Sequence, residues 1–137
     1  MDADDARRRF ASARVARLAT VGAQGRPHVV PIVFAVIGDT IYHAVDSKPK
    51  STRALRRFAN VSQNPEVCAL ADSYDDDWAT LWWARADGVG RVLGVADDES
   101  RLGIDALARR YPQYREHRPG GPVLAIDVRR WSGWSAS

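Results

Sequence analysis

Cysteine, lysine and long apolar runs are scarce in this sequence of 137 residues. The single cysteine, Cys68, excludes an internal disulfide bond and favours a reducing compartment. The longest apolar run, Val29 to Ile37, contains Pro31 and is too short for a transmembrane helix. The first residues, MDADDARRRF, lack the apolar segment of a secretory signal. We therefore expect a cytoplasmic protein with no membrane partner, folded as one domain over residues 1–137.

Catalytic and metal-binding motifs are also missing. The sequence contains no G-x-S-x-G, no H-E-x-x-H and no Walker motif. Its three histidines, His28, His43 and His117, do not have the spacing of metal ligands, so we expect no metal site. No catalytic dyad or triad is visible, so the catalytic residues are unknown at this stage. An enzyme with this sequence would depend on a bound cofactor for its chemistry.

The net charge of +3 and the pI of about 9.4 make nucleic acid a candidate partner. The arginines are scattered, however, and acidic residues lie between them. Motifs that read or stack on bases are missing. We therefore expect no nucleic-acid partner.

Hydrophobic periodicity predicts a mainly β protein with a few helices. The first three strands are expected to form an antiparallel meander, whose apolar middle strand is covered on both faces. Mostly consecutive antiparallel strands favour a small closed or split β-barrel of six to seven strands with peripheral helices, an α+β protein in the wider sense. An open α+β sheet is the alternative. In chain order, we expect a helix around 3–13, strands at 15–21, 28–37 and 40–45, and a helix after 52 that ends at the SQNP turn. A strand at 66–74 follows, and residues 78–94 then form either one long strand or a bent pair with a glycine bulge near 88–90. A helix around 104–114 after the acidic run DDES and a strand at 122–131 come last.

Both lysines, Lys48 and Lys50, fall within DSKPKST, residues 46–52, whereas the other 18 basic residues are arginines. A lysine ammonium group suits phosphate oxygens, and the start of a helix also attracts anions. Ser51 and Thr52 can add hydroxyl donors. The segment is therefore either an anion site or a solvated loop in which Ser51 is an ordinary helix cap.

Tryptophans are concentrated in two places. Trp78, Trp82 and Trp83 lie within DDDWATLWWARADG, and on a strand Trp82 and Trp83 would point to opposite faces. One face can enter the core while the other lines a cavity or a partner surface; alternatively, all three are core or dimer-interface residues. Trp131 and Trp134 belong to the tail RRWSGWSAS, which we expect to dock on another surface such as a second subunit.

The sequence contains GRPHVVPIVF, the run IYHAVDSKPKSTRALRRFANVSQNPEVCALADSYDDDWATLWWARADG and the terminal RWSGW. Together these stretches resemble the deazaflavin-dependent branch of the pyridoxamine 5'-phosphate oxidase-like proteins. These are small split β-barrel oxidoreductases that bind FMN or the deazaflavin coenzyme F420. The resemblance covers roughly residues 10–134. Its most specific parts are the K-P-K-x-T segment, the N-x-x-x-N-P turn and the D-W-x-x-L-W-W-x-R strand.

The resemblance implies a homodimer with two cofactor sites at the subunit interface. It also implies three groups of cofactor-binding residues. The cofactor phosphate would be held by Lys48, Lys50, Ser51 and Thr52. The ring system would lie against the second and third strands, near His28, Val30, Pro31, Tyr42, His43 and Ala44. The partner subunit would close the site with Trp78, Trp83 and Arg85.

The resemblance also bears on the choice of cofactor. Classical FMN oxidases of this fold bind phosphate partly through an arginine on the second strand, but here that strand reads HVVPIVF. This favours coenzyme F420 over FMN, whose use stays open as the alternative. Coenzyme F420 has a polyglutamate tail, which a basic rim of Arg53, Arg56 and Arg57 would suit.

The implied reaction is hydride transfer from the reduced deazaflavin to a small electron-poor acceptor, with the protein positioning both molecules. Tyr42, His43 and Arg85 are the candidates to donate a proton or stabilise charge, and the sequence does not choose among them. The acceptor stays open among quinones, tetrapyrroles, unsaturated lactones and fatty acids. Two alternatives remain: an FMN-dependent oxidoreductase, and a non-catalytic module that binds a cofactor, heme or another tetrapyrrole.

Overall fold

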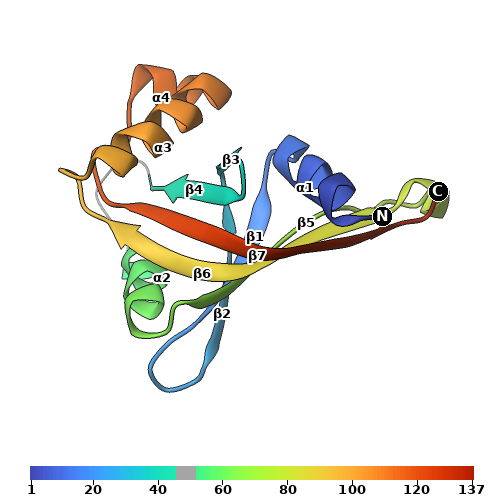
Figure 1. Cartoon of the computed structure of the whole chain (residues 1–137), viewed down its shortest axis with the longest axis horizontal. Coiled ribbons are helices and arrows are strands. Elements are labelled where there is room, and N and C mark those ends of the chain that lie inside the picture. Colours follow the sequence, from blue (N-terminus) through green and yellow to red (C-terminus); the bar gives the residue numbers. More distant parts are fainter. Residues whose placement is uncertain (46–51) are drawn as a thin grey trace.

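The computed structural model describes residues 1–45 and 52–137, with side chains described up to residue 45 and again from residue 56. Strands predominate, and the helices lie around them (Figure 1). In chain order the elements are α1 (Ala3–Ser12), β1 (Ala16–Val21), β2 (Pro27–Ile32), β3 (Ala35–Ile37), β4 (Thr40–Ala44), α2 (Thr52–Gln63), β5 (Glu66–Ser73), the 3-10 helix η1 (Trp78–Thr80), β6 (Trp82–Leu93), α3 (Asp98–Arg110), α4 (Pro112–Glu116) and β7 (Val123–Ser135).

All seven strands of the described part join one sheet in the order β2-β1-β5-β6-β7-β4-β3, and every neighbouring pair is antiparallel. The two edge strands, β2 and β3, follow each other directly in the chain. The sheet therefore curls so that its edges approach each other, and β1 and β2 run across the direction of β6 and β7 (Figure 1). The expected split barrel with antiparallel strands and peripheral helices is confirmed.

The expected continuous strand over residues 28–37 is wrong, and so is the meander. β2 pairs with β1, whereas β3 pairs with β4, and the chain bends between them. The Phe34 ring at the bend is fully buried, 4.9 Å from the Phe10 ring. The Phe34 carbonyl accepts hydrogen bonds from Arg110 Nη1 (3.0 Å) and the Tyr111 hydroxyl (3.0 Å). Residues far along the chain therefore fix a bend that the local sequence does not signal.

Strands β4 and β7 are covered on both faces. Along β7, Leu124 and Ile126 enter the main core, whereas Val123 and Ala125 enter a second core beneath α3. On β4, Ile41 belongs to the main core. This alternation explains why residues 123–126 of β7 are all apolar. Helix α1 packs on β6 and β7, and α2 packs on β1 and β6.

The tryptophan tail is part of the last strand, because β6 is long enough to pair with it as far as Ser135. Trp131 is 9% exposed, its ring lies 5.4 Å from the Phe10 ring, and its Nε1 donates a hydrogen bond to Asp39 Oδ1 at 3.0 Å. Trp131 thus docks on another surface as expected, but that surface belongs to its own chain and not to a second subunit. Trp134 remains 43% exposed.

The expected glycine irregularity in β6 is confirmed. The register shifts between Asp87 and Gly88, so that Arg129 on β7 has no direct partner in this pairing. A Cβ atom on Gly88 would lie 2.4 Å from the carbonyl oxygen of Asp127. The close approach of the two backbones thus requires glycine at this position.

The Gly88→Ala variant is expected to lose about 1–3 kcal/mol of unfolding free energy, because the backbone of β7 must move to admit the methyl group. Urea denaturation measures this loss. Gly120→Ala is the control, because a Cβ at Gly120 meets no atom within 4 Å. Equal stability of the two variants would contradict the close backbone approach.

Within residues 1–45 and 52–137, no helix is long and apolar enough to cross a membrane.

Candidate functional site

The predicted phosphate-binding residues lie at the connection between β4 and α2. Lys48, Lys50 and Ser51 are outside the described residues, and Thr52 is the first residue of α2, with a side chain that is also outside them. β4 ends at Ala44 and α2 begins at Thr52, so the connection runs from a strand into a helix as expected. Phosphate binding by these four residues stays a prediction.

The predicted ring-binding residues do not share one surface. On β2, His28 and Val30 are half-buried, and Pro31 is exposed on the opposite face. On β4, Tyr42 and Ala44 are buried in the core beneath α3. A Cβ atom on Gly103 of α3 would lie 2.8 Å from the Tyr42 ring, so the helix packs directly on it. His43 points to the other face of β4. There its ring stacks on the Phe58 ring, with 6.2 Å between the two ring centres.

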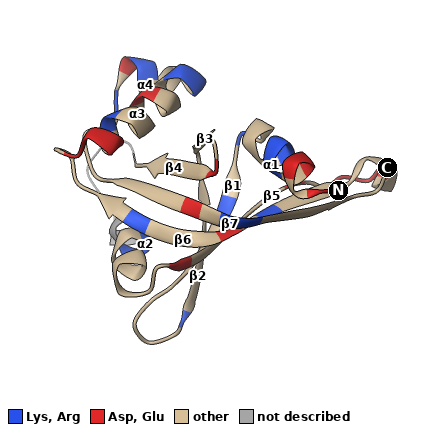
Figure 2. Ribbon diagram, viewed as in Figure 1, with Lys and Arg blue, Asp and Glu red and all other residues tan. Residues whose placement is uncertain are grey.

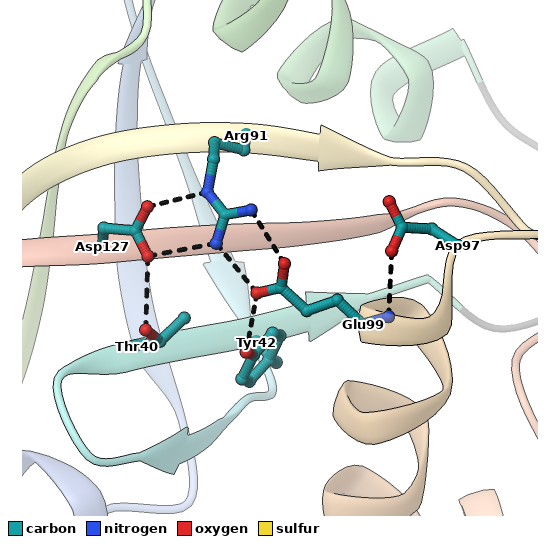
Figure 3. Close-up of polar contacts among 6 residues, drawn as sticks. All are labelled: Thr40, Tyr42, Arg91, Asp97, Glu99 and Asp127. Atoms are coloured by element: carbon teal, nitrogen blue, oxygen red, sulfur yellow. Dashed lines mark hydrogen bonds and ion pairs between the residues drawn. The ribbon is translucent and has the colours of Figure 1, made fainter.

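Tyr42 belongs to a polar network that links α3 to the sheet (Figure 3). Its hydroxyl donates to Glu99 Oε2 at 2.9 Å, and Glu99 also accepts two hydrogen bonds from Arg91 at 2.8 and 2.9 Å. Arg91 donates to Asp127 at 2.7 and 3.1 Å, and the Thr40 hydroxyl donates to Asp127 at 3.2 Å. The β6, β7, β4 and α3 elements are thereby joined through one guanidinium group.

This network fixes the charge states of its members. Burial, followed by the hydrogen bond to Glu99, raises the pKa of Tyr42 to about 12. The hydrogen bonds from Arg91 lower the pKa of Glu99 to about 2. At neutral pH the Tyr42 hydroxyl therefore keeps its proton and directs it to a carboxylate within the same chain. Its position favours a structural role over proton donation to a ligand.

His43 holds Arg57 of α2 in place. Its ring Nδ1 lies 2.9 Å from the carbonyl oxygen of Val33, and its Nε2 lies 2.8 Å from Arg57 Nη1. A carbonyl only accepts and a guanidinium only donates, so Nδ1 carries the proton and His43 is neutral. The two residues are 14 positions apart, and nothing in the sequence alone pairs them. Arg57 Nε is buried and has no hydrogen-bond partner among the described residues.

His43 is expected to make the protein sensitive to acid. The side chain is 2% exposed, and burial, together with the charge of Arg57, lowers its pKa to about 4 from an ordinary value of 6.5. Below pH 6.5 the unfolded chain therefore binds a proton that the folded chain still excludes. This histidine should leave stability unchanged above pH 6.5 and reduce it as the pH falls towards 4. The expected loss is about 2 kcal/mol at pH 5 relative to pH 8.

Urea denaturation of wild type and His43→Gln between pH 8 and pH 5 measures this loss. Glutamine can also donate and accept at this position but does not titrate. The difference in unfolding free energy between the two proteins should change with pH. Parallel curves would contradict a neutral, buried His43.

Several of the predicted residues meet on the outer face of the sheet. Strand register places Pro31, Arg17, Leu70, Arg85 and Ser132 in one row across β2, β1, β5, β6 and β7. Pro31 and Arg85, predicted from separate stretches, thus share a face.

The next row contains a small hollow. Asp72, Trp83 and Trp134 are paired there on β5, β6 and β7. A cavity of about 290 Å³ is lined by Leu70, Asp72, Tyr74, Trp83 and Arg85. The Arg85 guanidinium lies 5.5 Å from the centre of the Trp83 ring. An aromatic ring and an arginine that forms an ion pair with Asp87 therefore border one hollow on the outer face.

The alternation of the tryptophans is confirmed. Trp82 lies on the opposite face from Trp83. The Arg9 guanidinium carbon of α1 lies 5.3 Å from the centre of the Trp82 ring. Trp78 is not on the strand but in η1, at the tip between β5 and β6, and is 76% exposed. Closure of a site by these residues of a partner subunit stays a prediction. In the part of the chain that the structure describes, no group of three or more His, Cys, Asp or Glu side chains could hold a metal ion.

Comparison with known proteins gives a family and a set of similar folds. A family model for "Pyridoxamine 5'-phosphate oxidase" matches residues 3–135. No match is found among curated proteins.

Similar solved structures span almost the whole chain. The conserved hypothetical protein Rv2991 of Mycobacterium tuberculosis is 23% identical, with a TM-score of 0.72 over 99% of this chain and 86% of that one. A FAD-binding protein of Mesorhizobium loti is 19% identical, with a TM-score of 0.70 over 97% and 94%. HutZ, the heme storage protein of Vibrio cholerae, is 15% identical, with a TM-score of 0.73 over 98% and 95%. At these identities the likeness concerns the fold.

Proposed function

The chain belongs to the pyridoxamine 5'-phosphate oxidase family, and from this premise we propose that it is a cofactor-dependent reductase whose cofactor carries a ring and a phosphate group. We propose coenzyme F420 as that cofactor, with FMN as the alternative. When bound, the coenzyme would supply hydride transfer to a small electron-poor organic acceptor. The chain's own residues would bind and orient both molecules and exclude water.

The observation that carries this proposal is the placement of Arg57. His43 fixes one end of its guanidinium, while the buried Nε has no hydrogen-bond partner among the described residues. Arg57 lies in the second turn of α2, directly after the connection that contains Lys48 and Lys50. A buried guanidinium nitrogen without an acceptor fits a phosphate oxygen. The residues present thus suit a phosphate-bearing cofactor.

The outer face offers a surface for the ring. Pro31, Trp83 and Arg85 share this face, and Val29, 61% exposed, extends it along β2. Apolar side chains this exposed favour a covering partner. We propose a second copy of the chain as that partner, so that the ring would be enclosed between two subunits. Arg85 would then stabilise negative charge that develops on the acceptor.

The second strand supports coenzyme F420 over FMN. β2 reads PHVVPI and contains no arginine that could bind a flavin phosphate from within the strand. The FAD-binding protein of Mesorhizobium loti has a similar fold. A flavin is therefore the alternative cofactor to be tested.

Heme binding is less compatible with the buried histidine. A histidine binds heme iron through a ring nitrogen that carries no other bond partner. Both nitrogens of His43 are hydrogen-bonded, one to Val33 and one to Arg57. Ligation by His43 would break one of these bonds and leave a buried polar group without its partner.

Anaerobic turnover tests the proposal. The protein is mixed with reduced coenzyme F420 and one acceptor at a time, drawn from quinones, tetrapyrroles and unsaturated lactones, and oxidation of the coenzyme is followed by its absorbance. Oxidation that depends on protein and acceptor is the expected result. Tight binding without turnover on any acceptor would contradict a reductase and favour a non-catalytic cofactor-binding module.

A further inference from the structure

A second cavity, of about 530 Å³, lies between the β1–β2 hairpin and helix α2. It is separate from the hollow on the outer face, and the two cavities share no lining residue. Its lining includes two arginines and three amide side chains: Arg26, Arg56, Gln24, Asn60 and Gln63. Among the residues that the structure describes, no acidic side chain lines it. The cavity is therefore rich in hydrogen-bond donors and carries positive charge.

Hydrogen bonds hold the two walls of this cavity at a fixed separation. Asn60 Nδ2 on α2 donates to the hydroxyl of Thr20 at 3.0 Å, and the backbone N–H of Ala23 donates to Gln63 Oε1 at 3.0 Å. Thr20 is 1% exposed, so the first bond is buried. A Cβ atom on Gly22 would lie 2.8 Å from Asn60 Oδ1, which leaves no room for a side chain there. These two hydrogen bonds and the close contact at Gly22 thus hold the β1–β2 hairpin against helix α2.

The same contacts leave donors available for a ligand. Gln63 uses its carbonyl oxygen towards Ala23, so its NH₂ group can donate elsewhere. Neither Arg26 nor Arg56 has a carboxylate within 4.0 Å in the described part of the chain. In Figure 2 the hairpin between β1 and β2 carries positive charge and no negative charge. Two unpaired guanidinium groups and amide donors are the chemistry that recognises carboxylate or phosphate oxygens.

We propose that this cavity is an anion site for a flexible ligand segment that carries two or more carboxylate or phosphate groups. Two sources share this chemistry: an acidic extension of the cofactor, or a separate acidic substrate. The first source rests on the proposed function, and the position of the cavity next to the start of α2 favours it. Arg56 is four residues after Thr52, about 6 Å along the helix axis from the start of α2. A cofactor whose phosphate is held at that start can extend along α2 into the cavity.

Titration of the cofactor-free protein with a tri-glutamate peptide tests the site without relying on the ring. Calorimetry gives the affinity, and NMR of the Asn60 and Gln63 side-chain amides reports the location. The Arg26→Gln, Arg56→Gln double variant should bind the peptide at least about tenfold more weakly. The control is Arg101→Gln, Arg109→Gln, which removes the same charge from exposed positions of α3 and should stay within about twofold. Equal weakening in both variants, or no binding by wild type, would overturn the proposal.

A second comparison separates the two sources. The affinities for coenzyme F420, which has a polyglutamate tail, and for FMN, which lacks one, are measured for wild type and the Arg26→Gln, Arg56→Gln variant. Selective weakening of coenzyme F420 supports the cofactor extension as the ligand. If peptide binding is lost while both cofactors bind as before, the site takes a separate acidic molecule. Equal weakening of both cofactors would overturn a site specific for the acidic segment.

Discussion

Replacement of Lys48 and Lys50 together by alanine is expected to weaken binding of coenzyme F420 by about tenfold to more than a hundredfold. The two ammonium groups would contact the cofactor phosphate, and hydrogen bonds to charged groups contribute about 1.5–3 kcal/mol. The affected segment precedes α2, whose free backbone N–H groups would add to the proposed anion site. Quenching of ligand fluorescence measures the affinity of wild type and variant.

A charge-matched variant controls for the loss of net charge. Arg101→Ala, Arg109→Ala removes two positive charges from exposed positions on α3 and should bind the cofactor as wild type does. The unfolding free energy of the Arg101→Ala, Arg109→Ala variant should stay near that of wild type, since exposed substitutions usually change it by less than about 0.5 kcal/mol. Unchanged affinity in the lysine variant would mean that DSKPKST is a solvated loop after all.

Replacement of Trp131 by alanine is expected to cost about 3–5 kcal/mol of unfolding free energy. The ring fills the space between β7 and α1 against Phe10, and its loss also leaves Asp39 without the indole donor. Urea denaturation followed by circular dichroism measures the change.

Trp134→Ala is the matched control three residues further along the same strand. Its side chain is 43% exposed, so its loss should cost less than about 1 kcal/mol. Similar losses for the two variants, or a loss for Trp131→Ala that depends on protein concentration, would contradict burial within one chain. A concentration-dependent loss would point instead to a subunit interface.

Local sequence signals predicted the elements that local interactions stabilise. Asp97 caps α3 through the backbone N–H of Glu99 at 2.9 Å, which explains why the acidic run DDES marked the start of a helix. The SQNP turn ends α2 at Gln63, because Pro65 disfavours helix at the residue before it. Gly88 marked the register shift, because two backbones come too close for any side chain.

Long-range contacts decided what the sequence could not predict. The bend at Phe34 depends on Arg110 and Tyr111, 76 and 77 positions away. The last strand continues to Ser135 because β6 provides pairing partners as far as Trp82, which pairs with Ser135. A hydrophobic pattern over about ten residues carries no information on contacts between distant segments. The sequence therefore predicted a continuous strand over residues 28–37 and a tail separate from the last strand.

In the candidate site, too, local patterns predicted some features and contacts between distant elements decided others. The strand-to-helix connection and the alternation of Trp82 and Trp83 follow from local patterns. The pairing of His43 with Arg57 and that of Tyr42 with Glu99 depend on packing between elements. Tyr42 and His43 were two of the candidate proton donors, and these pairings favour a structural role for both, because each side chain already has a partner in its own chain.

The central claim, a bound ring cofactor with a phosphate group and coenzyme F420 as its identity, is tested most directly by parallel titration. The purified protein is titrated with coenzyme F420 and, separately, with FMN, while ligand fluorescence and quenching of the five tryptophans are followed. We predict micromolar or tighter binding of coenzyme F420 and weaker binding of FMN. Tighter binding of FMN would contradict the choice of deazaflavin, and binding of neither would contradict the cofactor site itself.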